Sequence, residues 1–291
     1  MRWEGNRESS NVEDMRSGGG GGGGFGLGGG AIGIGTIVIA LIGGALFGVN
    51  PLTLLGIMTG GGNAPVTQQA PAHPPPANDQ AAKFVSTVLG DTEDVWTDIF
   101  KQAGATYHDA KLVLFRGSVR TGCGAGQAAM GPFYCPADQK VYIDLSFYDT
   151  LKNRLGAPGD FAQAYVIAHE VGHHVQQELG ITDKVDQLRS RSSEAQANAL
   201  SVRVELQADC FAGVWANHAQ KARNILEQGD IEEAMNAAQK IGDDALQASA
   251  GRAVVPESFT HGTSAQRQHW FSTGLQQGTV KSCDTFNTRN L

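Results

Sequence analysis

Basic residues are few in this chain and do not cluster. The 291 residues include 22 Lys and Arg against 29 Asp and Glu, which gives a formal net charge of −7 and a pI near 5.6. A nucleic-acid-binding surface needs concentrated positive charge. The composition therefore argues against nucleic acid as a partner.

Cysteines are also scarce, and their spacing carries information. There are four, at positions 123, 135, 210 and 283, and no two form a Cys-x-x-Cys pair. That spacing disfavours a cysteine-based zinc site. An even number of cysteines in an extracytoplasmic domain indicates two disulfides, for which three pairings are possible. We expect Cys123–Cys135, closing a short glycine-rich loop, and Cys210–Cys283, pinning the C-terminal tail to a helix; free buried thiols would instead fit a cytosolic domain.

Charge is absent from one long stretch near the N-terminus. No Asp, Glu, Lys or Arg occurs between positions 17 and 78. Residues 31–49 are almost wholly apolar or Gly, and as a helix they would span about 28 Å, close to the hydrocarbon thickness of a bilayer. We therefore expect a cytoplasmic Gly-rich segment over 1–30, a transmembrane helix at 31–49 that contacts the lipid bilayer, and a Gly/Pro-rich linker over 50–78.

The flanks of this apolar run predict its orientation. A cleaved signal peptide is the alternative, but the leader is long and no Ala-x-Ala site directly follows the run. Arg2, Arg7 and Arg16 precede the run, and no Lys or Arg follows before Lys83. This bias predicts a single-pass protein of the inner membrane, with its N-terminus in the cytoplasm and its C-terminal domain in the periplasm. Glycine pairs at 29/33 and 44/48 have the spacing of helix-packing motifs and leave a homo-oligomer open.

The remaining residues, 79–291, are enough for one substantial domain. Apolar periodicity predicts a helix over 79–103, and short apolar runs predict strands at 111–117, 133–135 and 141–145. Helical patterns then dominate, at 160–179, 194–220, 230–248 and 263–276. Strands followed by helices indicate the α+β class. We expect an edge strand from 111–121 or 139–145 to pair with an extended substrate.

The most informative motif is His169-Glu170-Val171-Gly172-His173. Residues four apart lie on one face of a helix, so the two imidazoles can hold one zinc ion. Glu170 lies beside the first ligand, where it can act as a general base towards water. Gly172 in mid-helix predicts the close approach of a second helix.

A catalytic zinc site needs a third protein ligand. In one subclass of catalytic zinc sites, the third ligand is a His six residues after the second, with a Gly midway between them. Here the Gly position holds Gln176 and the His position holds Leu179, so this arrangement is absent. The segment 203–209 offers another solution, because Glu205 and Asp209 share a helical face. We assign Glu205 as the third ligand and Asp209 as the acceptor of the free ring N–H of a ligand His, most simply His169.

The run of residues 256–264 supplies another candidate, His261. It lies in a loop before a helix whose start carries a Ser/Thr cap. A catalytic imidazole in this position can stabilise the oxyanion of a tetrahedral intermediate. An ordinary loop His is the alternative.

The motif together with the downstream Glu-x-x-x-Asp resembles the gluzincin metallopeptidases. Further segments, among them 123–124, 131–136, 141–145, 205–216 and 260–264, are similar to the bacterial neutral zinc metallopeptidase family. The resemblance covers nearly the whole chain. It implies a zincin-like fold, one Zn²⁺ per chain, membrane anchoring through a Gly-rich N-terminus, and peptidase activity on a peptide or protein substrate.

Two hypotheses follow for function. The first is a membrane-anchored zinc peptidase that uses Glu170 as its general base. The second is an extracytoplasmic binding or scaffold module that contains zinc and whose activity is vestigial or latent. The presence of Glu170 favours the first, because a purely structural metal does not need that carboxylate.

Overall fold

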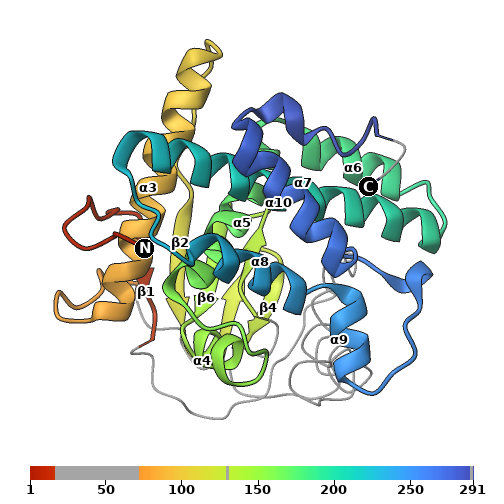
Figure 1. The fold of residues 1–291 in the computed structure, drawn as a ribbon, viewed down its shortest axis with the longest axis horizontal. Coiled ribbons are helices and arrows are strands. Elements are labelled where there is room, and N and C mark those ends of the chain that lie inside the picture. Colours follow the sequence, from red (N-terminus) through yellow and green to blue (C-terminus); the bar gives the residue numbers. More distant parts are fainter. Residues whose placement is uncertain (17–71, 129–130, 289–290) are drawn as a thin grey trace.

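The structure, a computed structural model, describes residues 1–16, 72–128, 131–288 and 291. It has a small mixed sheet on one side and a larger group of helices on the other, with helix α5 between them (Figure 1). The α+β class is therefore confirmed. The more specific zincin-like architecture stays a prediction.

The main sheet has four strands in the order β1-β2-β6-β5, namely Val12–Asp14, Lys111–Phe115, Lys140–Asp144 and Phe133–Cys135. β1 and β6 pair with β2 in parallel, and β5 pairs with β6 antiparallel. β2 and β6 are almost entirely buried, as expected of central strands rich in Leu, Val and Ile. β3 (Ser118–Thr121) and β4 (Gly124–Gln127) form a separate two-stranded ribbon.

This strand order corrects the expected sheet edge. We expected an edge strand from 111–121 or 139–145, but these ranges contain β2 and β6, the two central strands of the main sheet. The end of the first range forms β3, which belongs to the separate two-stranded ribbon. The edges of the main sheet are β1 and β5. The sequence patterns identified the strands but carried no information on which strands are internal.

The helices follow the expected order closely. α3 (Gln80–Gln102) begins at Asp79, whose side chain accepts the Ala82 N–H, and α5 covers Asp160–Glu178. α7 (Glu194–Arg223) and α10 (Ser264–Gln277) both begin with capping boxes, which satisfy otherwise unpaired backbone N–H groups. The other helices of the described residues are α4 (Ser146–Asn153), α6 (Ile181–Arg189), α8 (Asp230–Lys240), α9 (Asp243–Ser249), η2 (Pro256–Ser258) and η3 (Val280–Cys283).

One expected helix, 230–248, is divided into α8 and α9. The break falls at Gly242, where a Cβ would lie 2.4 Å from the backbone nitrogen of Ser264. The start of α10 therefore lies so close to the backbone at position 242 that any side chain there would clash with it. This contact involves residues distant in sequence, so local periodicity could not reveal it.

The N-terminal residues are part of the same folded body. β1 pairs with β2, Trp3 packs edge-on against Phe84, and the Met1 ammonium lies 2.7 Å from a carboxylate oxygen of Asp160. The domain limits expected from the sequence, 1–30 and 79–291, therefore separate residues that fold together. The expected span at 31–49 lies outside the described residues, and no helix in the described part of the chain is long and apolar enough to cross a membrane.

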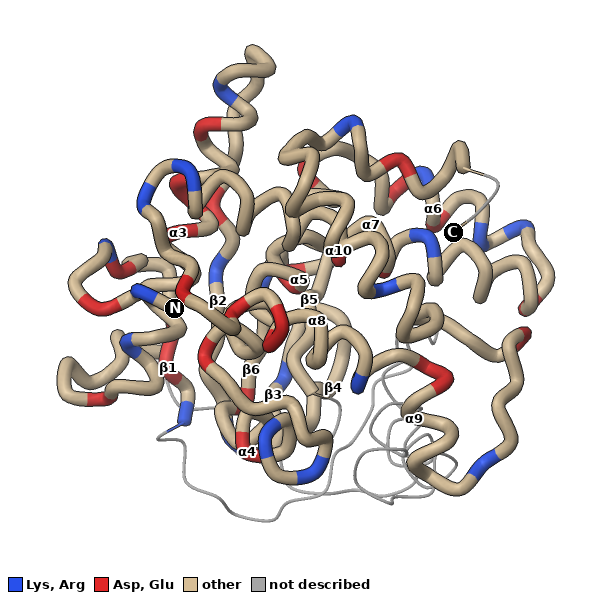
Figure 2. The backbone as a smooth tube through the Cα atoms, viewed as in Figure 1, with Lys and Arg blue, Asp and Glu red and all other residues tan. Residues whose placement is uncertain are grey.

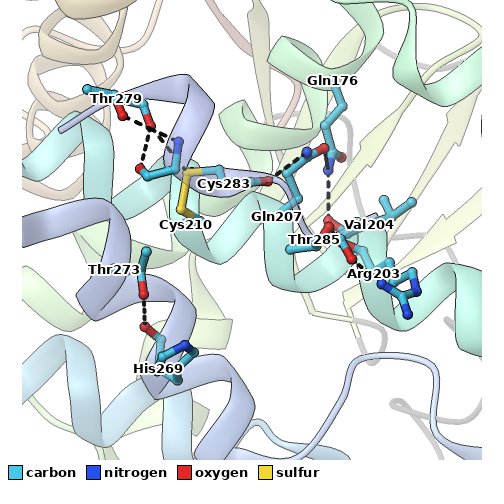
Figure 3. Close-up of a disulfide and its surroundings, with 11 residues drawn as sticks. Gln176, Arg203, Val204, Gln207, Cys210, His269, Thr273, Thr279, Cys283 and Thr285 are labelled. Atoms are coloured by element: carbon cyan, nitrogen blue, oxygen red, sulfur yellow. Dashed lines mark hydrogen bonds between the residues drawn. A yellow bond between two sulfur atoms is a disulfide. The ribbon is translucent and has the colours of Figure 1, made fainter. Parts of the chain in front are cut away.

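Both expected disulfides are present. Cys123 and Cys135 join the turn between β3 and β4 to strand β5, with Cα atoms 5.8 Å apart. Cys210 of α7 pairs with Cys283 of η3, with Cα atoms 5.6 Å apart. The second bridge fixes the C-terminal tail to α7, as Figure 3 shows.

Candidate metal centre

Two helices bring the three expected metal ligands together. α5 supplies His169 and His173, and α7 supplies Glu205. The two imidazole rings have centroids 4.8 Å apart and lie nearly perpendicular to each other. One ligand atom from each of the three residues falls within a mutual distance of 4.8 Å.

The separations between these atoms fit a zinc ion. Nε2 of His169 lies 3.2 Å from one Glu205 oxygen, and Nε2 of His173 lies 3.6 Å from the other. Zn–N and Zn–O bonds near 2 Å in a tetrahedral site place ligand atoms about 3.3 Å apart. Two imidazoles and a carboxylate also leave a fourth position for water or substrate, as catalytic zinc sites require.

The other ring nitrogens of both histidines are held by buried partners. Nδ1 of His169 donates to Asp209 at 2.8 Å, as the sequence predicted. Nδ1 of His173 donates to the side-chain oxygen of Gln176 at 2.9 Å. These bonds place a proton on each Nδ1 and leave each Nε2, facing Glu205, as the ring nitrogen that would bind a metal.

Asp209 is itself held by an unusually complete set of partners. The Arg267 guanidinium donates to both of its oxygens at 2.9 Å, and the Tyr165 hydroxyl donates at 2.5 Å. Burial alone would raise the pKa of Asp209, but the charges of Arg267 and His169 hold this pKa below its usual range. The carboxylate therefore stays ionised, which keeps it an acceptor for His169.

Glu170 lies on the same helix, only 8% exposed. Burial raises the pKa of its carboxyl group, against the opposing effect of His169 and His173. The pKa of Glu205 moves the other way. Burial tends to raise it, yet the charges of His173 and His261 hold it well below its usual range. The two carboxylates thus have different chemical characters, with Glu205 fixed as an anion and Glu170 the more basic group.

His261 lies close enough to this site for its charge to affect Glu205. Its Nδ1 donates to Asp243 at 3.1 Å, and the other Asp243 oxygen accepts the backbone N–H groups of residues 260, 261 and 262. Although burial lowers the pKa of His261, the charges of Asp243 and Glu205 raise it overall. Asp243 therefore orients both the loop and the imidazole.

Sequence reasoning missed several residues that the fold brings to the site: Tyr165, Gln176, Asp243 and Arg267. Tyr165 and Gln176 had a usable signal, because they lie four residues before His169 and three after His173 on the same helix. Asp243 had none, since it precedes His261 by 18 residues and belongs to another helix. The expected helix contact at Gly172 is confirmed, because a Cβ there would lie 3.0 Å from the Ala208 carbonyl oxygen of α7.

An α+β protein with His-Glu-x-x-His on one helix and Glu-x-x-x-Asp on a second has the site of a zinc-metallopeptidase-like protein. The chain belongs to the family described as "Putative neutral zinc metallopeptidase", whose sequence model matches residues 1–286. That family name implies zinc as the metal.

Known relatives extend over the same region. The uncharacterized protein YpfJ of Escherichia coli K12 is 56% identical over 291 residues, covering 98% of this chain and 99% of its own. The uncharacterized protein Rv2575 of Mycobacterium tuberculosis H37Rv is 39% identical over 221 residues, covering 72% of this chain and 74% of its own. No solved structure matches the chain.

Proposed function

We propose that the protein is a zinc-dependent peptidase that hydrolyses peptide bonds in protein or peptide substrates. The observation that carries this proposal is the convergence of Nε2 of His169, Nε2 of His173 and the Glu205 carboxylate, with Glu170 beside them. A bound zinc ion would supply Lewis acidity, polarising the scissile carbonyl and lowering the pKa of water. These three ligands would hold one ion per chain.

Glu170 is the general base of the proposed reaction. Its buried carboxylate takes a proton from the attacking water as the water oxygen bonds to the carbonyl carbon. The carbon–nitrogen bond then breaks, and the same proton passes from Glu170 to the leaving amine. A pKa raised by burial makes Glu170 a better acceptor for that proton.

His261 stabilises the negative charge that develops on the carbonyl oxygen. Against the effect of burial, Asp243 and Glu205 raise the pKa of His261 and so favour its imidazolium form. In that form Nδ1 donates to Asp243, and the Nε2–H is left to donate to substrate. Because Asp243 also binds three consecutive backbone N–H groups of the loop, the donor is fixed before substrate arrives. Preorganised donors of this kind stabilise a transition state without reorganisation at the moment of reaction.

An extended substrate is expected to pair with the edge of the main sheet formed by β5. Of the two edges, β1 is bridged by His73 through Asp14, whereas β5 packs beside the metal-bearing helix α5. Backbone pairing with β5 would place the peptide along this helix without demanding a particular side chain.

We also propose that the domain works in an oxidising compartment, attached to a bilayer through residues 31–49. The two disulfides support the first part, because such bonds persist outside the reducing cytosol. The uncharged composition of residues 31–49 supports the second.

The experiment that tests this function uses the full chain and a mixed peptide pool. Cleavage should stop on removal of metal by a chelator and return on addition of zinc. A chain that binds zinc but cleaves no peptide in the pool would move the assignment to a binding or scaffold module.

A further inference from the structure

The ligand His173 is connected to the Cys210–Cys283 disulfide by a continuous row of buried amides. Gln176 accepts the Nδ1–H of His173, and its own NH₂ group donates to Val204 O at 2.7 Å and to Gln207 Oε1 at 3.0 Å. The NH₂ group of Gln207 then donates to the carbonyl oxygen of Cys283 at 2.9 Å. Figure 3 shows this row from Gln176 to the disulfide.

The two ends of the row fix its direction. The backbone carbonyls of Val204 and Cys283 can only accept hydrogen bonds, so the NH₂ groups of Gln176 and Gln207 must face them. The side-chain oxygen of Gln176 is then left facing His173. This oxygen can only accept, so Nδ1 of His173 must carry a proton, and Nε2, the atom that faces Glu205, is the nitrogen left to bind a metal.

The tail that carries Cys283 is held beside the third ligand. The Thr285 hydroxyl donates to Arg203 O at 2.7 Å, and Arg203 donates to Thr288 O at 3.2 Å. The disulfide joins the same tail to α7 one turn beyond Gln207. Gln176 and Gln207 are both at most 5% exposed, so water does not replace a lost partner easily.

We propose that Gln176, Gln207 and the Cys210–Cys283 disulfide are positioning elements for the metal site, acting on His173 through this row. A thiol reductant that converts the disulfide to two thiols removes the covalent restraint on Cys283, so its carbonyl can shift and Gln207 and Gln176 can turn. Metal affinity then depends on the redox state of a bond that lies outside the ligand set. The inference rests on the proposed zinc site.

The test is zinc affinity, measured by competition with a chelator. Gln176→Leu should weaken binding about 10- to 100-fold, the usual effect of losing a partner of a ligand His. Gln207→Leu and the double variant Cys210→Ser/Cys283→Ser should each weaken it by roughly the lower end of that range. The matched control is Cys123→Ser/Cys135→Ser, which removes the other disulfide and should bind zinc as the wild type does.

Wild-type affinity in Gln207→Leu, which retains both disulfides, would overturn the inference. So would equal losses in the two cysteine double variants, because the effect would then be general destabilisation. These outcomes differ from a failure of the proposed zinc site, in which the wild-type chain itself would bind no zinc, and from a failure of the proposed peptidase activity, which would leave zinc affinity unchanged.

A second inference comes from the contacts of residues 1–16. The Glu93 carboxylate of α3 is buried, and its hydrogen bonds come from Arg7 at 2.8 Å, Ser9 at 2.5 Å and Asn11 at 2.8 Å. Gly90 is needed in the same helix, because a Cβ there would lie 2.9 Å from Arg7 O. Basic and acidic residues lie close together around β1 and α3 in Figure 2. These contacts fix residues 7–11 against helix α3 of the domain.

We infer that residues 1–16 and 72–291 fold on the same side of any membrane the protein contacts. Besides β1 itself, Arg16 pairs with Asp79 at 2.7 Å and Asp14 bridges His73, so both flanks of the uncharged stretch meet. A chain that crosses a bilayer once between these flanks would place them on opposite sides. The single-pass orientation expected from the arginine bias is incompatible with these contacts.

Cysteine labelling of the full chain in sealed right-side-out membrane vesicles tests this topology. Ser10→Cys and Ala250→Cys each add an exposed thiol, one on either side of the uncharged stretch. A membrane-impermeant maleimide should label both before lysis, or both only after lysis. Labelling of one site before lysis and of the other only after it would overturn the inference.

Discussion

At the scale of single residues, the role proposed for His261 is separable from metal binding. His261→Phe should keep zinc at the wild-type level but lower kcat by about 100- to 1,000-fold, the usual effect of losing one donor to an oxyanion. Steady-state kinetics and metal analysis of the same sample measure the two effects. Unchanged kcat would show that His261 only supports the loop.

The ion pairs of Arg16 predict that part of the free energy of unfolding is lost in acid. It donates to both Asp14 oxygens at 2.9 and 2.5 Å and pairs with Asp79. Burial tends to raise the pKa of both carboxyls. Arg16 nevertheless holds the pKa of Asp14 below its usual value, and the Ala82 N–H followed by Arg16 does the same at Asp79. A depressed folded pKa stabilises the protein above the unfolded value, and this contribution disappears as the pH falls through the folded pKa.

Arg16→Gln should therefore lower the free energy of unfolding by about 2 kcal/mol at pH 7, and the loss should shrink towards zero in acid below pH 3.8. Urea unfolding at several pH values measures this difference. Lys83→Gln is the control, because its exposed pair with Glu8 contributes at most about 1 kcal/mol. A difference between Arg16→Gln and wild type that stays constant with pH would contradict the account.

The residues identified from sequence form two pairs, each sharing one helical face. Four-residue spacing pairs His169 with His173 and Glu205 with Asp209, and the need of a catalytic zinc for a third ligand links the two pairs. Asp243 and Arg267 reach the site only through contacts between helices. Gln176 had the right spacing, but an amide side chain has no charge or metal affinity that marks it as functional.

At the scale of elements, close contact between α7 and α10 supports the site. A Cβ at Gly274 would lie 1.9 Å from Cys210 O, and a Cβ at Gly213 would lie 2.1 Å from Phe271 O. The two helices therefore approach with their backbones nearly touching. This approach places Arg267 of α10 against Asp209 of α7.

Gly274→Ala should force these helices apart. We expect a loss of at least about 3 kcal/mol in the free energy of unfolding, since backbone atoms rather than flexible side chains would clash. Gln276→Ala, an exposed change on the same helix, should stay within about 0.5 kcal/mol of wild type. Denaturant unfolding of the two variants compares them, and equal stability would contradict the packing described.

Element type was more predictable than element arrangement. Apolar periodicity locates α3, α5, α7 and α10 to within three residues, and side-chain caps begin all of these except α5. β1 has only three residues, and its pairing with β2 depends on contacts across about a hundred positions. No local pattern encodes such a pairing, so the N-terminal segment appeared separate from the domain.

At the scale of the whole molecule, we expect the fold to persist without the metal. The core extends through α3, α5, α7, α8 and α10, and two disulfides constrain the chain. Removing zinc should therefore leave the helical circular dichroism signal largely intact while lowering the unfolding temperature. Collapse of that signal on chelation would instead indicate a structural metal and favour the scaffold hypothesis.

The central claim is that Glu170 performs the chemistry at a zinc site built by α5 and α7. The most direct measurement compares zinc content and peptide cleavage in the full wild-type chain, Glu170→Gln and Glu178→Gln, the last being the same change near the end of the same helix. We predict one zinc per chain in all three, with cleavage lost only in Glu170→Gln. Full cleavage by Glu170→Gln would contradict the account.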